Sequence, residues 1–369
     1  MYVISLIKSQ RTAGQNIAAF VLPQSRIDVE LRAANVPVFY AQCRSHFHLA
    51  DIRTLRQLLH KHQFEIIHSH TSTDVWPTSI AATGFRNLAH VTSVYVVTIP
   101  KHDPHHWLIY KKVDAVISSS TYTNARLERD LPIAPKKIHL VRYGRHLEAF
   151  RPSPNERYDV RSQYGIPMDS ITFGMIGRLD PQKGVREFAE SLLELPSDIR
   201  SRVTYLIIGK HENADCEMNV WLDSFKQHPQ VNGRLFILPF AENIVPYFNA
   251  LDVLVLASYR EMYSLSVIEA MAMRLPVIGT DREGTTEQIG KNERGILIEP
   301  HSPKAIADAV CQYVENPVLR VKHGEAGHYW VHREHAMDRM LESLGNVYSC
   351  ALERRVGSTA SLTGLTERS

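Results

Sequence analysis

The chain has 369 residues, of which 44% are hydrophobic and 22% are charged, and its formal net charge is +3. This length favours two domains, and the composition is typical of a folded globular protein rather than of a disordered or fibrous one. No run reaches the roughly 18 apolar residues that a membrane-spanning helix needs, so no such helix is expected.

Short apolar runs alternate with segments of helical periodicity along residues 1–150. The first segment places Tyr2 and Leu6, and less regularly Ile4 and Ile7, on one side of a helix. Alternation of this kind predicts a mostly parallel sheet that is covered on both faces. Strands are predicted at 16–23, 36–43, 64–70, 90–97 and 114–120, and helices at 25–34, 50–62 and 121–130.

The polar, proline-bearing stretch 151–167 is the best candidate for a linker, and the alternation begins again after it. The fold class is therefore α/β, with two doubly wound Rossmann-like domains at 1–150 and 151–331 and a ligand cleft between the carboxyl ends of their strands. The helical stretch 332–353 is a candidate for crossing back to the first domain, and the Ser/Thr/Gly-rich tail 354–369 is expected to be disordered. Strands of the second domain are predicted at 170–177, 203–209, 233–240, 252–258, 276–281 and 295–300.

Charge is distributed unevenly between the two halves. Residues 1–150 carry 18 Lys/Arg against 10 Asp/Glu, whereas the remainder carries 24 against 29. Two interpretations stay open: ordinary surface variation, or a first domain that contacts something anionic, such as the inner face of a phospholipid membrane. Nucleic acid is not expected as a partner, because no basic run interleaved with aromatic residues is present.

The cysteines indicate a reducing compartment. All four are scattered and lack metal-ligand spacing, which is typical of free thiols in the cytoplasm. The first ten residues, MYVISLIKSQ, have neither a basic leader nor a small-residue cleavage site, so no secretory signal is expected.

Two motifs of the second half carry the chemistry. In GRLDPQKG, Arg178 and Lys183 follow a strand and are suited to binding a diphosphate. In EMYSLSVIEAMA, Glu261 and Glu269 lie around the start of a helix. Because apolar residues surround Glu269, its burial is costly unless a partner pairs with it, and sugar hydroxyls are good partners. Cations for phosphates and carboxylates for hydroxyls together indicate a nucleotide-sugar site.

Each of these charges has an ordinary explanation as well. Arg178 and Lys183 are individually compatible with solvated loop charges, and Glu261 with a surface carboxylate. Glu269 is harder to explain in this way, because its helical neighbours are apolar.

Taken together, the motifs resemble the retaining glycosyltransferases of family 4 (glycosyl transferases group 1), which have the two-domain GT-B fold. The resemblance covers nearly the whole chain and is strongest between about 170 and 300. It implies that Arg178 and Lys183 bind the donor diphosphate, that Glu269 holds the ribose hydroxyls, and that Glu261 contacts the transferred sugar.

The resemblance also implies roles for the backbone. The amides of Ser264 and Leu265 would receive phosphate or sugar oxygens at the start of a helix, where the helix dipole also favours anions. Gly177 and Gly209 would lie at strand ends where a side chain would block the nucleotide. Family members generally need no metal, and two side-chain cations can supply the required charge, so no metal or cofactor is expected.

In the first domain, HSHTSTDVW resembles an acceptor-side segment found in a subset of the family. The candidates there are His70, Thr73 and Asp74, although helix capping at the entry to 75–85 explains Asp74 equally well. Relatives have a histidine near the end of the following strand, where this chain reads SVYVV (93–97). If this alignment holds, an acceptor-side group is missing. His102, His105 and His106 follow shortly after, and two interpretations of them stay open: exposed loop histidines, which the sequence favours, or a substitute for that group.

Two further departures from the family pattern stand out. Relatives usually have glycine where Arg274 stands, and a left-handed conformation there would cost arginine roughly 1–2 kcal/mol. Relatives also begin with a strand and a glycine-rich turn before anything that resembles residue 16. We expect both to be absent here, through a misassigned start or a real truncation.

The resemblance implies transfer of a sugar from a nucleoside-diphosphate-sugar donor to a hydroxyl of a glycan or glycolipid acceptor, with retention of configuration. Biosynthesis of cell-surface polysaccharide or lipopolysaccharide is the implied setting, in the cytoplasm with peripheral membrane contact left open. One alternative is a truncated, catalytically impaired relative that binds nucleotide sugar without transfer. Another is a sugar-nucleotide epimerase, which the Glu261/Glu269 pattern fits less well.

Overall fold

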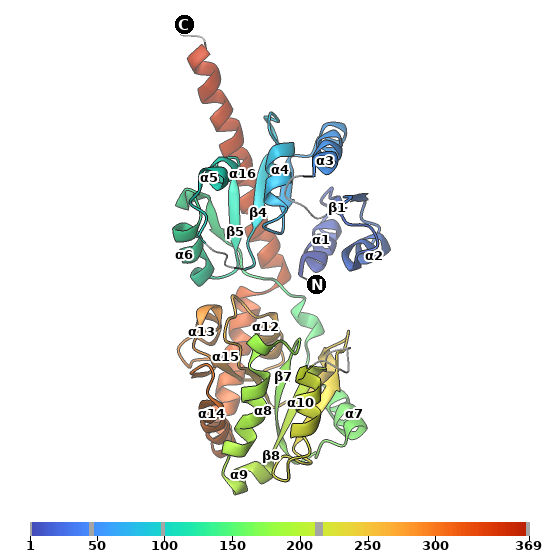
Figure 1. Ribbon diagram of the computed structural model, residues 1–369, viewed down its shortest axis with the longest axis vertical. Coiled ribbons are helices and arrows are strands. Elements are labelled where there is room, and N and C mark those ends of the chain that lie inside the picture. The colour runs from blue at the N-terminus through green and yellow to red at the C-terminus, as the bar shows by residue number, and fades with distance from the viewer. Residues whose placement is uncertain (1, 44–47, 97–99, 211–216, 367–369) are drawn as a thin grey trace. The chain divides into compact units, whose positions relative to one another are not determined.

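The computed structural model describes residues 2–43, 48–96, 100–210 and 217–366. The chain divides into two compact units, the first made of Met1–Tyr143 with Met337–Ser369 and the second of Gly144–Ala336. Each unit consists of parallel strands and covering helices (Figure 1), so the predicted α/β class with two Rossmann-like domains is confirmed. The chain enters the second unit at Gly144, slightly before the boundary expected after residue 150.

The strands of the first unit are parallel and form two separate sheets, one of β1 and β2 and one in the order β3-β4-β5-β6. Five of these strands overlap the predicted ranges, and β6 has no predicted counterpart. Their bounds are β1 Ala19–Val21, β2 Val38–Tyr40, β3 Ile66–Ser69, β4 Ala89–Ser93, β5 Ala115–Ser118 and β6 Ile138–Leu140.

Helix α1 contacts side chains of both sheets of the first unit. Its Ile4 and Ile7 pack with Ala19 of β1, whereas Leu6 packs with Ala89 and Val91 of β4. The helix predicted at the start of the chain is thereby confirmed. The helices of this unit are α1 Tyr2–Thr12, α2 Arg26–Ala33, α3 Leu49–His62, α4 Val75–Ala81, α5 Pro104–Tyr110, α6 Thr121–Asp130 and α16 Met337–Thr366.

The second unit contains one six-stranded parallel sheet in the order β12-β11-β10-β7-β8-β9. From β7 the chain continues outward through β8 and β9, and it then returns to the other side of β7 to form β10, β11 and β12. All six strands predicted for this domain are confirmed. Their bounds are β7 Ile171–Ile176, β8 Val203–Lys210, β9 Leu235–Pro239, β10 Val253–Leu256, β11 Val277–Thr280 and β12 Gly295–Ile298.

Helices cover both faces of this sheet. On one face, Phe173 and Met175 of β7 pack in one cluster with Phe188 of α8 and Val310 of α14. Helix α12 contacts β10, β11 and the long helix α15. The helices of the second unit are α7 Pro154–Tyr164, α8 Val185–Glu194, α9 Ser197–Arg202, α10 Glu217–Phe225, α11 Val245–Asn249, α12 Leu265–Ala272, α13 Glu283–Ile289, α14 Pro303–Glu315 and α15 Pro317–Glu334.

The linker predicted at 151–167 is wrong, because most of this stretch is helix α7. Ser153 accepts a hydrogen bond from the Glu156 amide as N-cap, Pro154 occupies the first turn, and Gly165 closes the helix at φ 68°. Proline at the start and glycine just after the end mark the borders of a helix as readily as they mark a loop. Packing against α11 then selects the helical alternative.

Helix α16 runs from Met337 to Thr366 (red in Figure 1), through most of the tail for which disorder is predicted. Its first half is anchored, since Met340, Leu344 and Val347 pack against the sheet of the first unit. Each further turn then adds hydrogen bonds to an existing helix, which offsets the low helix propensity of Ser, Thr and Gly. None of the helices in the described part of the chain combines the length and apolar character needed to cross a bilayer.

Arg274 adopts the left-handed conformation at the position where relatives usually have glycine, with φ 61°. Arg274 follows the end of α12, and its guanidinium pairs with Glu325 of α15. The ion pair is exposed at both side chains, so it offsets little of the backbone cost.

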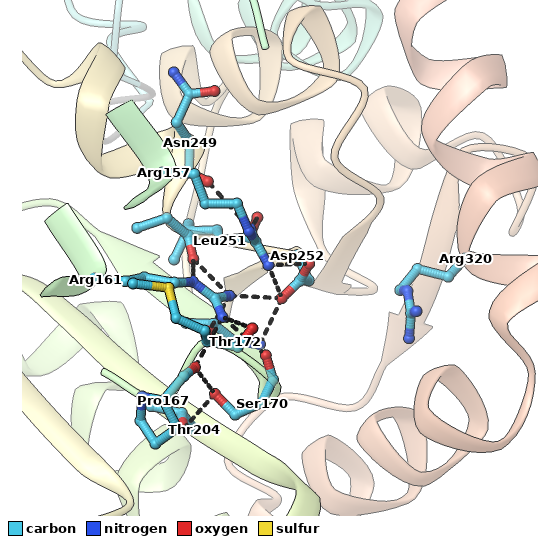
Figure 2. Close-up of polar contacts among 12 residues, drawn as sticks. Arg157, Arg161, Pro167, Ser170, Thr172, Thr204, Asn249, Leu251, Asp252 and Arg320 are labelled. Atoms are coloured by element: carbon cyan, nitrogen blue, oxygen red, sulfur yellow. Dashed lines mark hydrogen bonds and ion pairs between the residues drawn. The ribbon is translucent and has the colours of Figure 1, made fainter. Parts of the chain in front are cut away.

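A fully buried arginine ties α7 to the second sheet (Figure 2). Arg161 donates to the carbonyls of Pro167, Ser170 and Ala250 at 3.0–3.1 Å and to Asp252 Oδ2 at 2.9 Å. Asp252 also accepts two bonds from Arg157 of the preceding turn. The Arg161 guanidinium therefore supplies hydrogen-bond donors to the backbone carbonyls that lie just before the amino-terminal ends of β7 and β10.

We expect Arg161→Met to lower the free energy of unfolding by about 3–5 kcal/mol, because several buried carbonyls lose their donor at once. Urea denaturation followed by circular dichroism measures this loss. Arg157→Met is the matched control, since its side chain is 31% exposed and its loss should cost roughly 1 kcal/mol or less. Equal stabilities of the two variants would contradict the role given to Arg161.

Candidate functional site

The predicted donor-binding residues of the second unit gather at the carboxyl ends of β7, β8 and β10. From β7 the chain passes to β8 on one side of the sheet, and it later returns to form β10 on the other side of β7. The loops that follow β7 and β10 therefore diverge at this point of the sheet. Open parallel sheets bind ligands where the strand order reverses in this way. The fold thus places GRLDPQKG and EMYSLSVIEAMA beside one another, although they are far apart in sequence.

The loop after β7 presents Arg178 and Lys183. Arg178 is exposed, and the 3₁₀ turn Pro181–Lys183 follows, capped by the Asp180 carboxylate on the Gln182 amide at 2.9 Å. Gly184 ends the turn at φ 68°, and a Cβ there would lie 2.2 Å from the carbonyl oxygen of Ala257. Glycine at this position therefore lets the β7 loop approach the backbone that follows β10.

Lys183 and Glu261 meet directly. Lys183 Nζ donates to Glu261 Oε2 at 2.6 Å, and their side chains are 30% and 15% exposed. The Glu261 amide in turn donates to Glu283 Oε2 at 2.9 Å. A Cβ on Gly284 would lie 1.8 Å from the Met262 carbonyl oxygen, so the start of α13 also packs closely against this loop.

Gly177 and Gly209, at the ends of β7 and β8, differ in what a side chain at each position would contact. Gly177, at φ 150°, has no described atom within 4 Å of a Cβ built on it, so the described part of the chain does not by itself require glycine there. A Cβ on Gly209 would lie 1.9 Å from the carbonyl oxygen of Gly177. The close approach of these two backbones is by itself a reason for glycine at position 209, and the predicted approach of a nucleotide there stays a prediction.

The two amides predicted to bind oxygens at the start of α12 differ in availability. The Ser264 amide already donates to Gln288 Oε1 at 2.9 Å, and Gln288 Nε2 donates back to the Ser264 carbonyl at 2.8 Å. No hydrogen bond from the Leu265 amide to another described residue is found. Leu265 is thus the better candidate of the pair, and the reciprocal Gln288 bonds fix the entry of the helix.

Glu269 has a protein partner that the sequence analysis missed. Its carboxylate is 12% exposed and pairs with the guanidinium of Arg145, which is 18% exposed. Burial raises the pKa of Glu269, and the charge of Arg145 acts in the opposite direction. No spacing or periodicity in the sequence connects residue 145 to residue 269, so the pairing has no sequence signal.

In the first unit, His70 follows β3 and forms a hydrogen bond through Nδ1 to the Tyr95 hydroxyl at 2.6 Å. Tyr95 stands in SVYVV, the segment where relatives have a histidine. Asp74 occupies the N-cap position of α4 without a side-chain cap bond, and no hydrogen bond of the Thr73 side chain is found within the described ranges. His70 is therefore joined to a residue beside β4, whereas Thr73 and Asp74 show no such link.

A second histidine extends this polar group. The rings of His68 and His70 stack with centroids 4.1 Å apart, and His68 forms hydrogen bonds to Ser93 and to Tyr348 of α16, each at 2.8 Å. Burial lowers the pKa of His70 to about 4 and raises that of Tyr95 well above its usual value. Both side chains are thus neutral near pH 7, which suits hydrogen bonding to a hydroxyl rather than binding of a charge.

Among the described residues, one group has a ligand geometry suited to a metal: Cys43, His48 and Asp51, with potential ligand atoms within 4.8 Å of one another. Asp51, however, accepts hydrogen bonds from the amides of Gln42 and Cys43 and pairs with His48 at the start of α3. Hydrogen bonds to the loop before α3 and the pair with His48 therefore account for the placement of Asp51.

Comparison with known families assigns both halves of the chain. Residues 156–330 match the family described as glycosyl transferases group 1, and residues 1–149 match glycosyltransferase family 4. The chain belongs to glycosyltransferase family 4. The resemblance inferred from the motifs is thereby confirmed.

Curated family 4 relatives share about a quarter of their residues with this chain. The D-inositol 3-phosphate glycosyltransferase of Streptomyces coelicolor is 27% identical over an alignment of 269 residues, and the match covers 66% of this chain and 58% of that enzyme. The lipopolysaccharide core biosynthesis mannosyltransferase LpcC of Rhizobium leguminosarum is 28% identical over 249 residues, 67% of either chain. The chain thus spans little more than half the length of the first of these relatives.

Solved structures confirm the GT-B fold. A glycosyltransferase from Rickettsia africae superposes with a TM-score of 0.85 at 20% identity, covering 95% of this chain and 93% of its own. HepE from Anabaena, solved in complex with UDP-glucose, gives a TM-score of 0.78 at 17% identity, with 94% of each chain covered.

The buried His90 of β4 should make the folded protein sensitive to acid. Its ring is hydrogen-bonded to Ser69, Thr78 and Ser79 at 3.0–3.1 Å, and burial lowers its pKa from 6.5 to about 3. The unfolded chain takes up a proton on this histidine below about pH 6.5, whereas the folded chain does not. Stability is therefore lost as pH falls through this range, with a slope approaching 1.4 kcal/mol per pH unit, about 2 kcal/mol between pH 7 and pH 5.

Urea unfolding of wild type and His90→Asn at pH 7 and pH 5 tests this expectation. Asparagine keeps part of the hydrogen bonding but cannot titrate, so the variant should be less stable at pH 7 and lose less stability at pH 5. The comparison of the two proteins cancels the contribution of titratable groups that both contain. Among these groups is Asp114, whose carboxylate accepts a hydrogen bond from the His90 amide. Parallel pH dependences would show that His90 is not the titrating group.

Proposed function

We propose that this protein transfers a sugar, with retention of configuration, from a nucleoside-diphosphate-sugar donor to a hydroxyl of a glycan or glycolipid. The observation that carries the proposal is the contact of Lys183 with Glu261, because it joins the two motifs at the point where the strand order reverses. An LPS core mannosyltransferase among the relatives and a UDP-glucose complex among the structural neighbours support this donor class and a role in cell-surface glycan synthesis.

The donor would be bound by the second unit. Arg178 and Lys183 would hold the diphosphate and offset the charge that develops on the departing nucleoside diphosphate. Glu269 would accept hydrogen bonds from the ribose hydroxyls, and Glu261 from the transferred sugar. The Leu265 amide, at the start of an eight-residue helix, would add a donor for a phosphate oxygen.

A front-face mechanism suits these residues. The acceptor oxygen would bond to the anomeric carbon on the side from which the diphosphate leaves, and its proton would pass to the departing phosphate oxygen. Double displacement would need a carboxylate nucleophile with a second carboxyl group about 5 Å away. Glu261, the carboxylate assigned to the sugar, is neutralised by Lys183, which favours a binding role over a nucleophilic one.

We expect Lys183→Ala to lower turnover by about 100-fold or more, since a cation is lost where the leaving group gains charge. A panel of UDP-, GDP- and ADP-sugars first identifies the donor by calorimetry and by sugar release. Lys304→Ala serves as control, because Lys304 is exposed on α14 and its ion pair within the described part of the chain is with its helical neighbour Asp308. A decrease smaller than about fivefold would count against the assignment of Lys183.

On the acceptor side, Tyr95→Phe and His70→Ala should lower kcat/KM for the acceptor by about 10- to 100-fold, because misplacement of the attacking hydroxyl is costly. Donor affinity should not change, since these residues belong to the first unit. Transfer to free and lipid-linked oligosaccharides provides the measurement, and His60→Ala, which changes an exposed histidine of α3, provides the control. A parallel loss of donor affinity would contradict an acceptor-side role.

One observation favours the second candidate function, a relative that binds nucleotide sugar without transfer. The strands of the first unit form two separate parallel sheets. Within the described part of the chain, β1 and β3 therefore each have one edge to which no other strand is hydrogen-bonded. Donor binding in calorimetry, without hydrolysis or transfer, would support this candidate.

A further inference from the structure

Arg145 is held in place independently of Glu269. Its amide donates to the His335 carbonyl at 2.8 Å, and the residue forms a parallel bridge with Ala336, where the chain runs back toward the first unit. The guanidinium carbon lies 5.4 Å from the centre of the Phe150 ring. The Nε atom is buried and has no hydrogen-bond partner among the described residues. The guanidinium is therefore aimed at Glu269 by backbone bonds and by an aromatic ring.

Glu269 depends on this cation. The carboxylate lies in the middle of α12, whose neighbours Val267, Ile268 and Met271 are fully buried. An isolated ionised carboxylate in such surroundings takes up a proton instead of remaining charged. Among the described residues, Arg145 is the charged group that bonds to it.

Other titratable groups on the elements around α12 point elsewhere. His328 of α15 is hydrogen-bonded to the Ala272 carbonyl at the far end of the helix, and His335 to the Tyr263 hydroxyl. Arg274 pairs with Glu325, as described above. None of these groups bonds to the Glu269 carboxylate.

We propose that Arg145 is a positioning residue for the donor: it keeps Glu269 ionised and turned so that the carboxylate accepts hydrogen bonds from the ribose hydroxyls. The inference rests on the proposed donor site. Arg145 bonds to Oε1, which leaves lone pairs of the carboxylate for the diol. Hydrogen bonds to a carboxylate are roughly twice as strong as bonds between neutral groups, so protonation of Glu269 would weaken ribose binding.

The experiment uses the full chain and measures the dissociation constant of UDP, GDP and ADP by calorimetry from pH 6 to pH 9. For the diphosphate that binds, Arg145→Met should weaken binding by about tenfold or more at pH 6 and progressively less toward pH 9, because rising pH favours the ionised carboxylate. Glu269→Gln should weaken binding at every pH. The double variant should bind no more weakly than Glu269→Gln alone, because Arg145 acts through Glu269.

Two controls separate positioning from folding. Arg145→Lys should restore part of the affinity at pH 6, since it keeps the charge. Arg333→Met, which removes an exposed arginine paired with Glu334 on α15, should bind like wild type. Circular dichroism confirms that each variant is folded.

Two results would overturn the inference. Independent, additive losses in the double variant would show that Arg145 contacts the nucleotide itself, and tighter binding by Arg145→Met would show that it competes with the ribose. Absence of binding by all three diphosphates would instead count against the proposed function. In that case infrared spectroscopy of the ligand-free protein tests the inference. At pH 6, Arg145→Met should show the band of a protonated carboxyl group. Wild type and the double variant Arg145→Met/Glu269→Gln should lack this band.

Discussion

The donor site proposed in the second unit depends on the carboxylate of Glu269, which is largely shielded from water. The Glu269 side chain is 12% exposed and lies in an apolar helix, so its charge persists only where another group supplies what solvent would have supplied. Arg145 does this from the segment that enters the unit. The Arg145 amide donates to the carbonyl of His335, which lies in the segment that leaves the unit. The pairing of the entering and leaving segments is therefore linked to the ionisation of Glu269.

Close backbone contacts bring the remaining site residues together. Gly184 lets the loop after β7 reach Ala257, and Gly284 lets α13 reach Met262. Any side chain at either position would push the loops apart and separate Lys183 from Glu261. The site thus depends as much on two positions without a side chain as on the charged residues themselves.

The first unit shows a different use of burial. His68, His70, Tyr95 and Tyr348 form a partly buried polar group, in which the pKa values of His68 and His70 lie below their usual range. Neutral hydrogen-bonding groups of this kind can orient a hydroxyl without attracting an anion. The donor side, with Arg178 and Lys183, is by contrast suited to a charged ligand.

Local patterns were sufficient for most of the fold. Strands such as β7 and β10 are short apolar runs, and the amphipathic α3 and α6 have helical periodicity, so each follows from the burial of its own face. Helix α7 was misread because Pro154 and Gly165 are compatible with either a loop or helix ends, and only its packing on α11 and the buried Arg161 distinguish the two. For α16, the turns packed beside β4 extend the helix into a tail whose own propensity is low.

The sequence by itself determined the family, the α/β class and the charged residues after β7 and β10, because each is carried by a short motif whose chemistry does not depend on distant residues. Only the tertiary structure revealed that Arg145 pairs with Glu269, that Gln288 takes the Ser264 amide, and that Gly209 accommodates the Gly177 carbonyl. These contacts join residues from 24 to 124 positions apart. No local pattern encodes them, because they arise only when parallel strands bring distant loops to one edge of a sheet.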